Sequence, residues 1–270
     1  MPDFPETVLL TGASSGIGRE LAEIFAADGS RLILVARSGE TLAALAAELK
    51  TRHGVDALVV SQDLACPAAA EQVFRKIQEA GWPVHVLVNN AGFGEHGRFH
   101  EISIDRQLDM VQLNVGALLH LAHLVLPQMI ERRSGAILNV GSTAAFQPGP
   151  YAAVYFASKA FVLSFSDALR EEVRCFNIKV TCLCPGPTQT NFGNASGMNR
   201  TRTFRWTSLS ANDVARAGYR ALRRGRRMAV PGLLNKLIAL ATRLVPRGVL
   251  LRVVGYFNDT TCGTASSTRL

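Results

Sequence analysis

The stretch from Thr7 to Gly29, TVLLTGASSGIGRELAEIFAADG, decides the fold. It opens with an apolar run and continues with the glycine-rich segment TGASSGIG, after which apolar side chains recur at helical spacing until Gly29. This order predicts a buried strand, a tight turn and a helix. A unit of this kind is typical of sheets in which parallel strands alternate with covering helices.

The glycine-rich segment is suited to bind a pyrophosphate. Its glycines allow a tight turn and a close approach of the backbone, and a helix that starts near Ser15 presents unpaired amides and the positive end of its dipole. A glycine-rich turn without a ligand is the alternative, but the flanking strand and helix supply the context that a dinucleotide fingerprint requires. The predicted cofactor contacts here are Gly12, Ser14, Ser15, Gly16, Ile17 and Gly18.

The next predicted strand, RLILVARS at residues 31–38, ends where the adenosine ribose of a dinucleotide would lie, about 20 positions past the glycine loop. An acidic residue there would select NAD. This chain has Ala36 and Arg37 instead, and a guanidinium can bind a 2′-phosphate through two hydrogen bonds. NADP(H) is therefore favoured over NAD(H), while the alternative for Arg37 is a solvated loop arginine.

The alternation of strands and helices continues along the chain. Helical patterns cover residues 41–54 and 67–81, and buried strands cover residues 56–64 and 85–92. The expected fold is α/β, a doubly wound parallel sheet of about seven strands with helices on both faces. Ligands bind beyond the carboxyl ends of such strands, where turn formers are also common. The polar clusters at these ends are Asp63 with Leu64, and Asn90 with Ala91 and Gly92.

Two further segments carry candidate catalytic groups. Residues 153–176 predict a long helix on which Tyr155 and Lys159, four residues apart, share one face. A nearby cation favours the ionised phenol and lowers its pKa, so this pair could move a proton, although the same spacing also arises by chance on solvated helix faces. A second helix is expected over residues 105–132. The amide of Asn114 at its centre needs partners, or it must face water.

Together, TGASSGIG, NNAG, Asn114, Ser142, Tyr155 and Lys159 closely resemble the short-chain dehydrogenase/reductase family, with a Rossmann-type fold, over residues 6 to about 232. The resemblance implies that Tyr155 exchanges a proton with the substrate oxygen and that Ser142 holds this oxygen. It implies that Lys159 lowers the phenol pKa and binds the nicotinamide ribose, and that Asn114 holds a water. The turn Pro185, Gly186 and Thr188 would lie beside the nicotinamide. Helix pairing in the family implies a homodimer or homotetramer.

The net charge of +8 is concentrated at the C-terminal end, because residues 198–270 contain 14 Lys and Arg against 2 acids. Residues 233–258 predict an amphipathic helical extension that follows the catalytic domain of residues 1–232. It could cover the substrate pocket or a partner subunit, lie on a membrane surface, or contact an acidic carrier or coenzyme A. Nucleic-acid binding is not favoured, since no recognisable module accompanies the arginines. Residues 259–270 lack periodicity and are expected to be disordered.

The remaining composition favours a cytoplasmic protein, and a peripheral position at a membrane is the alternative location. Five scattered cysteines and no signal-like N-terminus argue against a disulfide framework, and no apolar run approaches the roughly 20 residues of a membrane span. Cys182 and Cys184 are expected in the core, and no metal site is predicted.

These features predict an NADPH-dependent reductase or dehydrogenase that interconverts a carbonyl and an alcohol on an apolar substrate, such as a ketoacyl or steroid-like compound. A cofactor-binding regulatory or membrane-associated protein with little turnover is the alternative. The residues expected to line the substrate pocket are Phe93, Ala144, Phe146, Tyr151 and Phe192.

Overall fold

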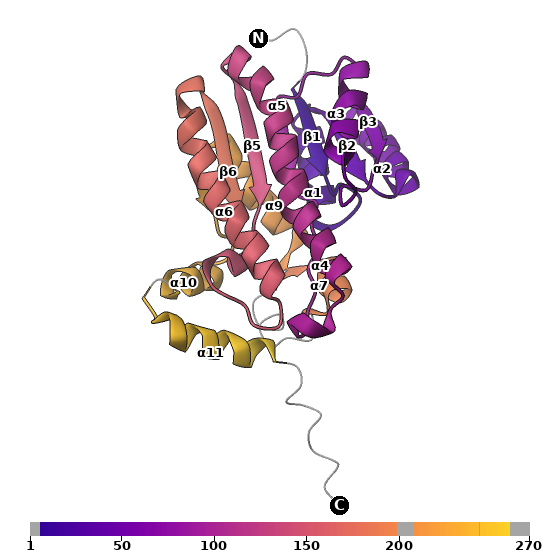
Figure 1. Ribbon diagram of the computed structural model, residues 1–270. Coiled ribbons are helices and arrows are strands. Elements are labelled where there is room, and N and C mark those ends of the chain that lie inside the picture. The colour runs from indigo at the N-terminus through magenta and orange to yellow at the C-terminus, as the bar shows by residue number, and fades with distance from the viewer. Residues whose placement is uncertain (1–5, 199–207, 243, 260–270) are drawn as a thin grey trace, which may run out of the picture.

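The computed structural model of the chain describes residues 6–198, 208–242 and 244–259. Its centre is a seven-stranded sheet with the order β3-β2-β1-β4-β5-β6-β9, in which every neighbouring pair is parallel (Figure 1). This confirms the predicted α/β fold class. The strands are β1 (Thr7–Thr11), β2 (Arg31–Ala36), β3 (Ala57–Ser61), β4 (Val86–Asn89), β5 (Gly135–Val140), β6 (Ile178–Leu183) and β9 (Met228–Ala229).

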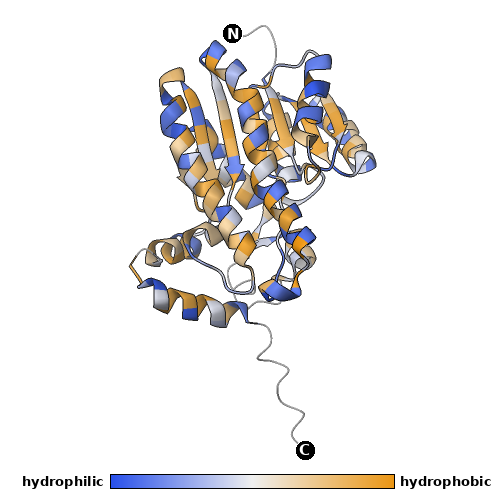
Figure 2. Ribbon diagram, viewed as in Figure 1, coloured by the Kyte–Doolittle hydropathy of each residue, from blue (hydrophilic) through white to orange (hydrophobic). Residues whose placement is uncertain are grey.

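Helices cover both faces of the sheet because its central strands are apolar on both sides. Along β1, Val8 and Leu10 pack on one face and Leu9 on the other, as the two-residue period of a strand requires. The first face is covered by α1 (Gly16–Ala27), α2 (Gly39–His53) and α9 (Ala211–Arg223). The second face is covered by α3 (Ala69–Glu79), α5 (Leu118–Arg132) and α6 (Ala153–Val173). In Figure 2 the strands carry the densest hydrophobic colour.

The strand order reverses between β1 and β4. From β1 the chain builds outward to β2 and β3 on one side, and then returns to place β4, β5, β6 and β9 on the other. Loops that leave β1 and β4 in opposite directions open a crevice at their carboxyl ends, which is where ligands bind in open parallel sheets. The fold therefore places the glycine loop and the NNAG segment side by side.

The long helix predicted over residues 105–132 contains a wider turn. The structure divides it into α4 (Ile104–Val111), a π-helical segment (Gln112–Ala117) and α5. Such segments occur mostly as single turns within α-helices and frequently at functional sites. By length and composition alone, Ile104–Arg132 could cross a membrane. Leu121 and Val125 nevertheless pack in the core against the sheet, as the side chains of a core helix do.

The C-terminal extension forms two helices rather than one. These are α10 (Leu233–Ala241) and α11 (Arg247–Asn258), and Pro246 occupies the N-cap position of α11. Both lie beyond the carboxyl end of the sheet and outside its layers (Figure 1). Residues 260–270 of the tail expected to be disordered are outside the described part of the chain. The shorter elements are β7 (Thr188–Gln189), β8 (Leu209–Ser210), α7 (Asn191–Ser196) and 3-10 turns at Phe99–Glu101, Thr143–Phe146 and Arg174–Phe176.

Candidate active site

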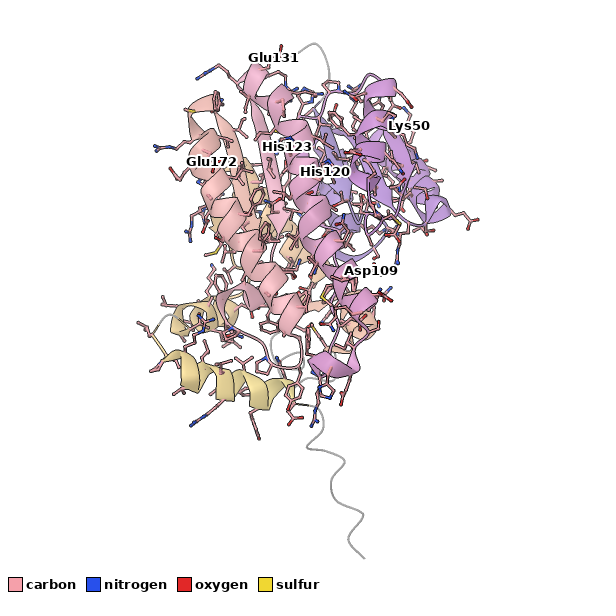
Figure 3. All side chains as sticks on the ribbon, in the orientation of Figure 1. Lys50, Asp109, His120, His123, Glu131 and Glu172 are labelled. Atoms are coloured by element: carbon pink, nitrogen blue, oxygen red, sulfur yellow. The ribbon has the colours of Figure 1, made fainter. Side chains whose placement is uncertain are left out.

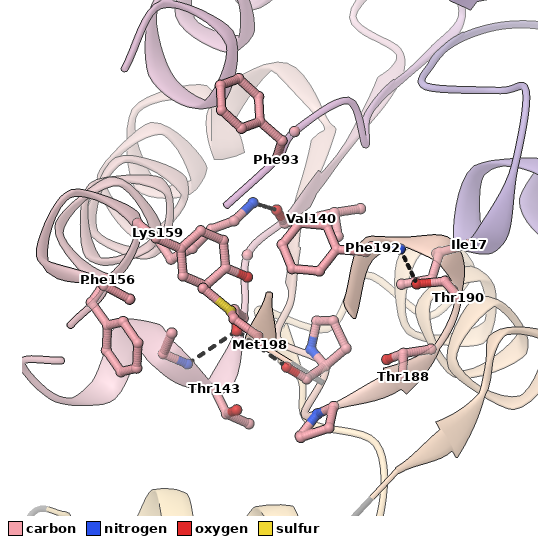
Figure 4. Close-up of a pocket in the computed structure, with 18 of the residues that line it drawn as sticks. Ile17, Phe93, Val140, Thr143, Phe156, Lys159, Thr188, Thr190, Phe192 and Met198 are labelled. Atoms are coloured by element: carbon pink, nitrogen blue, oxygen red, sulfur yellow. Dashed lines mark hydrogen bonds between the residues drawn. The ribbon is translucent and has the colours of Figure 1, made fainter. Parts of the chain in front are cut away.

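A cavity of about 1340 Å³ occupies the crevice at the carboxyl ends of the strands and extends to α10 and α11 (Figure 4). It is larger than the usual range of ligand pockets, roughly 300 to 1,000 Å³, so it has room for more than one ligand. Most of the predicted site residues line it together. They are Gly12, Ser14, Ser15, Gly16, Ile17, Arg37, Asp63, Leu64, Asn90, Ala91, Gly92, Ser142, Tyr155, Lys159, Pro185, Gly186 and Thr188.

The glycine loop has the close packing that its sequence predicts. Asn90 Nδ2 donates to the carbonyls of Thr11 at 2.9 Å and Gly12 at 3.1 Å, which fixes the loop to the end of β4. A Cβ on Gly18 would lie 2.1 Å from the Gly12 carbonyl oxygen. Gly18 is buried beneath the loop and does not line the cavity, so its contribution is the close packing of helix and turn.

The N-terminus of α1 fits the phosphates of a dinucleotide. Its N-cap residue Ser15 makes no side-chain capping hydrogen bond, and the first turn holds no acidic residue. The first-turn amides therefore have neither a Ser15 side-chain cap nor a first-turn carboxylate to occupy them, and Ser15, Gly16 and Ile17 line the cavity.

Arg37 stands at the end of β2, where the sequence predicts the 2′-phosphate. Its backbone carbonyl accepts a hydrogen bond from Ser61 Oγ at 2.9 Å, which anchors the residue, and its guanidinium forms no ion pair with any described residue. The carboxylate of Asp63 on the neighbouring loop accepts from the Ala65 amide at 3.0 Å. The guanidinium of Arg37 is therefore available to bind an anion at the rim of the cavity.

Tyr155 is held in the middle of the cavity wall by α6. Its ring packs between Phe156 and Phe192, with ring centroids 6.1 and 5.7 Å away, and the Ser142 hydroxyl lies beside its phenol. Burial raises the pKa of Tyr155 to about 12, although the neighbouring Ser142 hydroxyl acts in the other direction. The phenol pKa is therefore raised and not lowered, because burial dominates. The contribution of Lys159 to it stays a prediction.

Lys159 lies one turn further along α6 and is also buried. Its Nζ donates to the Val140 carbonyl at 3.0 Å, as Figure 4 shows, and lies 5.8 Å from the centroid of the Tyr155 ring. Burial lowers the pKa of Lys159 to about 8, so at neutral pH most molecules still carry the charge. Behind it are the buried thiols of Cys182 and Cys184, with the two Sγ atoms 3.6 Å apart, in the core as predicted.

Asn114 is fully buried behind the cavity wall. Its Oδ1 accepts from the Phe93 amide at 3.0 Å, and its Nδ2 donates to the Phe93 carbonyl at 2.9 Å and to Ser158 Oγ at 3.1 Å. The partners that the sequence argument requires are therefore protein groups. Its role in holding a water stays a prediction.

Three of the five residues expected in the substrate pocket, Phe93, Ala144 and Phe192, line the cavity, and Phe146 and Tyr151 do not. Phe146 ends a 3-10 turn and packs into a separate core cluster. Tyr151 has φ 63° and stacks on His96, with ring centroids 6.2 Å apart. Proximity in sequence to Ser142 and Tyr155 did not determine which way these two side chains point.

The sequence argument missed several apolar wall residues, most of them from α10 and α11. On α10 they recur four and three residues apart, and on α11 they recur three, four and seven apart, which is the spacing of one helix face. The sequence offered cover of the substrate pocket as one role of residues 233–258, and the structure places this face of the two helices on the cavity wall. The missed residues are Phe156, Met198, Leu234, Ile238, Ala241, Val245, Val249, Leu250, Val253, Val254 and Phe257.

His120 and His123 lie on the outer side of the fold and not in the cavity. His120 and His123 lie along α5 (Figure 3), and His120 Nε2 is 3.5 Å from a Glu71 carboxylate oxygen on α3. Within residues 6–198, 208–242 and 244–259, no group of three or more His, Cys, Asp or Glu side chains is arranged to hold a metal ion.

Comparison with known proteins identifies the class to which this site belongs. Residues 6–200 match the family described as short chain dehydrogenase, and the chain is therefore a member of the short-chain dehydrogenase/reductase family. A sulfoacetaldehyde reductase 2 from Chromohalobacter salexigens is 37% identical over 217 residues, which are 78% of this chain and 85% of that protein. A very-long-chain 3-oxoacyl-CoA reductase from Laccaria bicolor is 40% identical over 176 residues, 64% of this chain. The chain spans about half of the length of that relative, 52%.

Solved structures share the whole fold. A short-chain dehydrogenase from Sphingobium yanoikuyae in complex with NADPH is 33% identical, with a TM-score of 0.80 over 88% of this chain and 93% of that one. A short-chain dehydrogenase/reductase from Burkholderia phymatum in complex with NAD is 26% identical, with a TM-score of 0.80 over 89% and 92%. Similar folds thus accept either nicotinamide dinucleotide.

Proposed function

We propose that this protein is an NADPH-dependent oxidoreductase that interconverts a carbonyl and an alcohol on an apolar substrate. The observation that carries the proposal is the phenol of Tyr155. It is buried, lies beside the Ser142 hydroxyl, and faces the same cavity as the glycine loop and the guanidinium of Arg37. A proton donor beside a dinucleotide-shaped crevice is what carbonyl reduction requires.

The chain's own residues account for each contact that the cofactor needs. The α1 amides would hold the pyrophosphate, Arg37 the 2′-phosphate, Lys159 the ribose hydroxyls, and the Pro185–Thr188 turn the carboxamide. When bound, the nicotinamide supplies or accepts a hydride.

Tyr155 would act as the general acid in reduction and as the base in oxidation. A pKa of about 12 keeps the phenol protonated at neutral pH, so the proton is present when negative charge develops on the substrate oxygen. The ammonium of Lys159 would stabilise the phenolate that remains after the transfer, and the Ser142 hydroxyl would fix the substrate oxygen. The pKa of the Tyr155 phenol is thus high in the protein alone. We expect it to fall when the charged Lys159 and a bound cofactor act on the phenol together.

The NADPH preference rests on charge at the end of β2. Arg37 is the cation at that rim, and its guanidinium is not engaged by any described carboxylate. A 2′-phosphate would gain charge-assisted hydrogen bonds there, whereas a ribose hydroxyl would lack the acidic partner it usually finds.

The apolar substrate rests on the wall beyond Tyr155. Phe93, Phe156, Phe192 and Met198 line the cavity (Figure 4) and pack against the apolar cluster that contains Tyr155. Side chains of α10 and α11 line the far side of the cavity. The Laccaria relative is named for a 3-oxoacyl-CoA and the Chromohalobacter relative for sulfoacetaldehyde, which is small and anionic. The aromatic and aliphatic wall fits the lipophilic kind of substrate better than the anionic kind.

A homo-oligomer is part of the same proposal. Leu119 on α5 and Phe161 on α6 are exposed apolar side chains on the two helices that the family resemblance assigns to subunit pairing. Burial of such side chains against a second copy would stabilise the assembly.

The test is NADPH oxidation, followed at the nicotinamide absorbance band with a panel of apolar ketones. Tyr155→Phe should lower kcat by about 100-fold to 10,000-fold while NADPH binding and the melting temperature stay near those of the wild type. Saturable NADPH binding with no turnover across the panel would favour a cofactor-binding regulatory protein instead.

A further inference from the structure

Helices α10 and α11 are apolar on two sides. On α10, Leu234, Ile238 and Ala241 line the cavity, whereas Leu233, Leu237 and Leu240 do not. On α11, Val253 and Phe257 line the cavity, whereas Leu251 and Tyr256 belong to a separate shallow hollow. A helix that is apolar all round is normally enclosed by protein or by lipid.

The outward sides of these helices are not enclosed by the described chain. Leu233 is 74% exposed, Leu240 56%, Leu244 80% and Tyr256 61%. Most of the large apolar side chains exposed by the described residues lie on these two helices. Some of these exposed side chains line the cavity. The others, with Leu244 between the two helices, form what we call the outer face, defined by Leu233, Leu237, Leu240, Leu244, Leu251 and Tyr256.

The outer face is also cationic. Lys236 follows Leu233 by three residues and precedes Leu240 by four, so it shares their side of α10. Arg247 and Arg252 are exposed on α11, and the sequence from Val214 to Asn258 contains no Asp or Glu. Helices that lie in a lipid headgroup layer typically combine leucines with cationic side chains and with tyrosine or tryptophan.

We propose that the outer face of α10 and α11 docks on an anionic lipid surface, with the two helices lying in the plane of the interface. The same helices form the far wall of the cavity, so a docked protein would hold its substrate pocket one helix away from the lipid. A substrate that partitions into lipid would then reach Tyr155 with little passage through water.

A second copy of the chain fits the outer face less well than lipid does. A two-fold interface would bring Lys236, Arg247 and Arg252 of one protomer toward the same three residues of its partner, because such an interface is self-complementary. Neither helix carries a carboxylate to offset that repulsion. Anionic headgroups satisfy the cations while the acyl region covers the leucines.

The test is co-sedimentation of the full chain with vesicles of phosphatidylcholine alone and of phosphatidylcholine mixed with phosphatidylglycerol. We expect binding to the mixed vesicles that weakens as salt is added. The double variant K236E/R252E should weaken this binding on the order of 30-fold or more, from two lost cations near the surface. L237Q/L240Q should weaken it about tenfold or more by removing buried apolar area.

The matched control is R75E/K76E, which makes the same change of charge at two exposed positions of α3. It should bind as the wild type does, and so should Tyr155→Phe, because docking requires no turnover. Equal losses in K236E/R252E and R75E/K76E, or equal binding to neutral and mixed vesicles, would overturn the proposal. So would a lipid-independent oligomer, seen by sedimentation velocity, that L237Q/L240Q dissociates. Failure of the ketone assay alone would leave the vesicle result intact.

Discussion

Asn114 and the backbone of Phe93 exchange two hydrogen bonds, one from the Phe93 amide to Asn114 Oδ1 and one from Asn114 Nδ2 to the Phe93 carbonyl. The distances are 3.0 and 2.9 Å. The Asn114 side chain thus pairs with both the backbone amide and the backbone carbonyl of Phe93, as a residue of a neighbouring strand would. A π-helical turn presents Asn114 to that loop, which gives the wider turn a structural purpose.

The first prediction concerns this pair. Asn114→Ala leaves the Phe93 amide and carbonyl without their side-chain partner in a partly buried loop, and each such loss costs up to about 1 to 3 kcal/mol. We expect the free energy of unfolding to fall by about 2 to 4 kcal/mol and the KM for NADPH to rise as the loop loosens. Urea unfolding and initial-rate kinetics measure the two effects. Gln72→Ala, at an exposed position of α3, should stay within about 0.5 kcal/mol of the wild type, and equal losses in both variants would contradict the assignment.

The sequence predicted that Asn114 needs partners but not the turn that supplies them. A single π turn keeps apolar residues three and four apart on either side, so the helical periodicity hides it. Similarly, the four-residue spacing of Tyr155 and Lys159 predicted their shared face correctly. The direction of the phenol pKa was wrong because spacing carries no information on burial, and burial is the larger effect at this site.

The alternation of strands and helices followed from local patterns, whereas the residues of the far wall of the cavity did not. Each strand and each covering helix has its own periodicity, and the right-handed connection of parallel strands leaves few topologies. The approach of α10 to the Pro-Gly turn depends on a tertiary contact, in which a Cβ on Gly186 would lie 2.4 Å from Asn235 Oδ1. Nothing local to either segment signals that contact.

The second prediction uses the buried charge of Lys159. Its pKa is about 8 in the folded protein, against 10.5 in the unfolded chain, so between these values the unfolded state binds more protons. Stability contributed by this group therefore rises with pH across that window. We expect the difference in unfolding free energy between wild type and Lys159→Met to rise by about 1 kcal/mol per pH unit from pH 8 to 10.

Urea unfolding at several pH values measures this difference, in which the titrating groups that do not interact with Lys159 cancel. Tyr155, Cys182 and Cys184 interact with Lys159 and are not among them. The window ends at pH 10 because the raised pKa of Tyr155 acts in the opposite direction above the ordinary value of 10. A difference that does not vary with pH would show that Lys159 titrates normally in the folded protein.

The third prediction concerns the floor of the glycine loop. Gly18→Ala places a methyl group 2.1 Å from the Gly12 carbonyl oxygen and 2.5 Å from Asn90 Nδ2, so the loop must move. We expect a loss of about 1 to 3 kcal/mol in stability and a weaker NADPH affinity, measured by thermal unfolding and fluorescence titration. Gly248→Ala, with open space around its Cβ position on α11, should be neutral or slightly stabilising. An unchanged NADPH affinity in Gly18→Ala would mean that the loop does not bind phosphate.

The fourth prediction concerns cofactor choice at Arg37. Arg37→Asp removes the guanidinium that would pair with the 2′-phosphate and puts a carboxylate in its place, which repels the phosphate and can accept a hydrogen bond from a ribose hydroxyl. Hydrogen bonds to charged groups contribute about 1.5 to 3 kcal/mol, so we expect the ratio of kcat/KM for NADPH to that for NADH to fall about 100-fold. Arg75→Asp makes the same change on α3, outside the cavity, and should leave the ratio unchanged. Because Arg37 has no ion pair to lose within the described chain, its replacement should not lower the melting temperature, and an unchanged cofactor ratio would place the 2′-phosphate elsewhere.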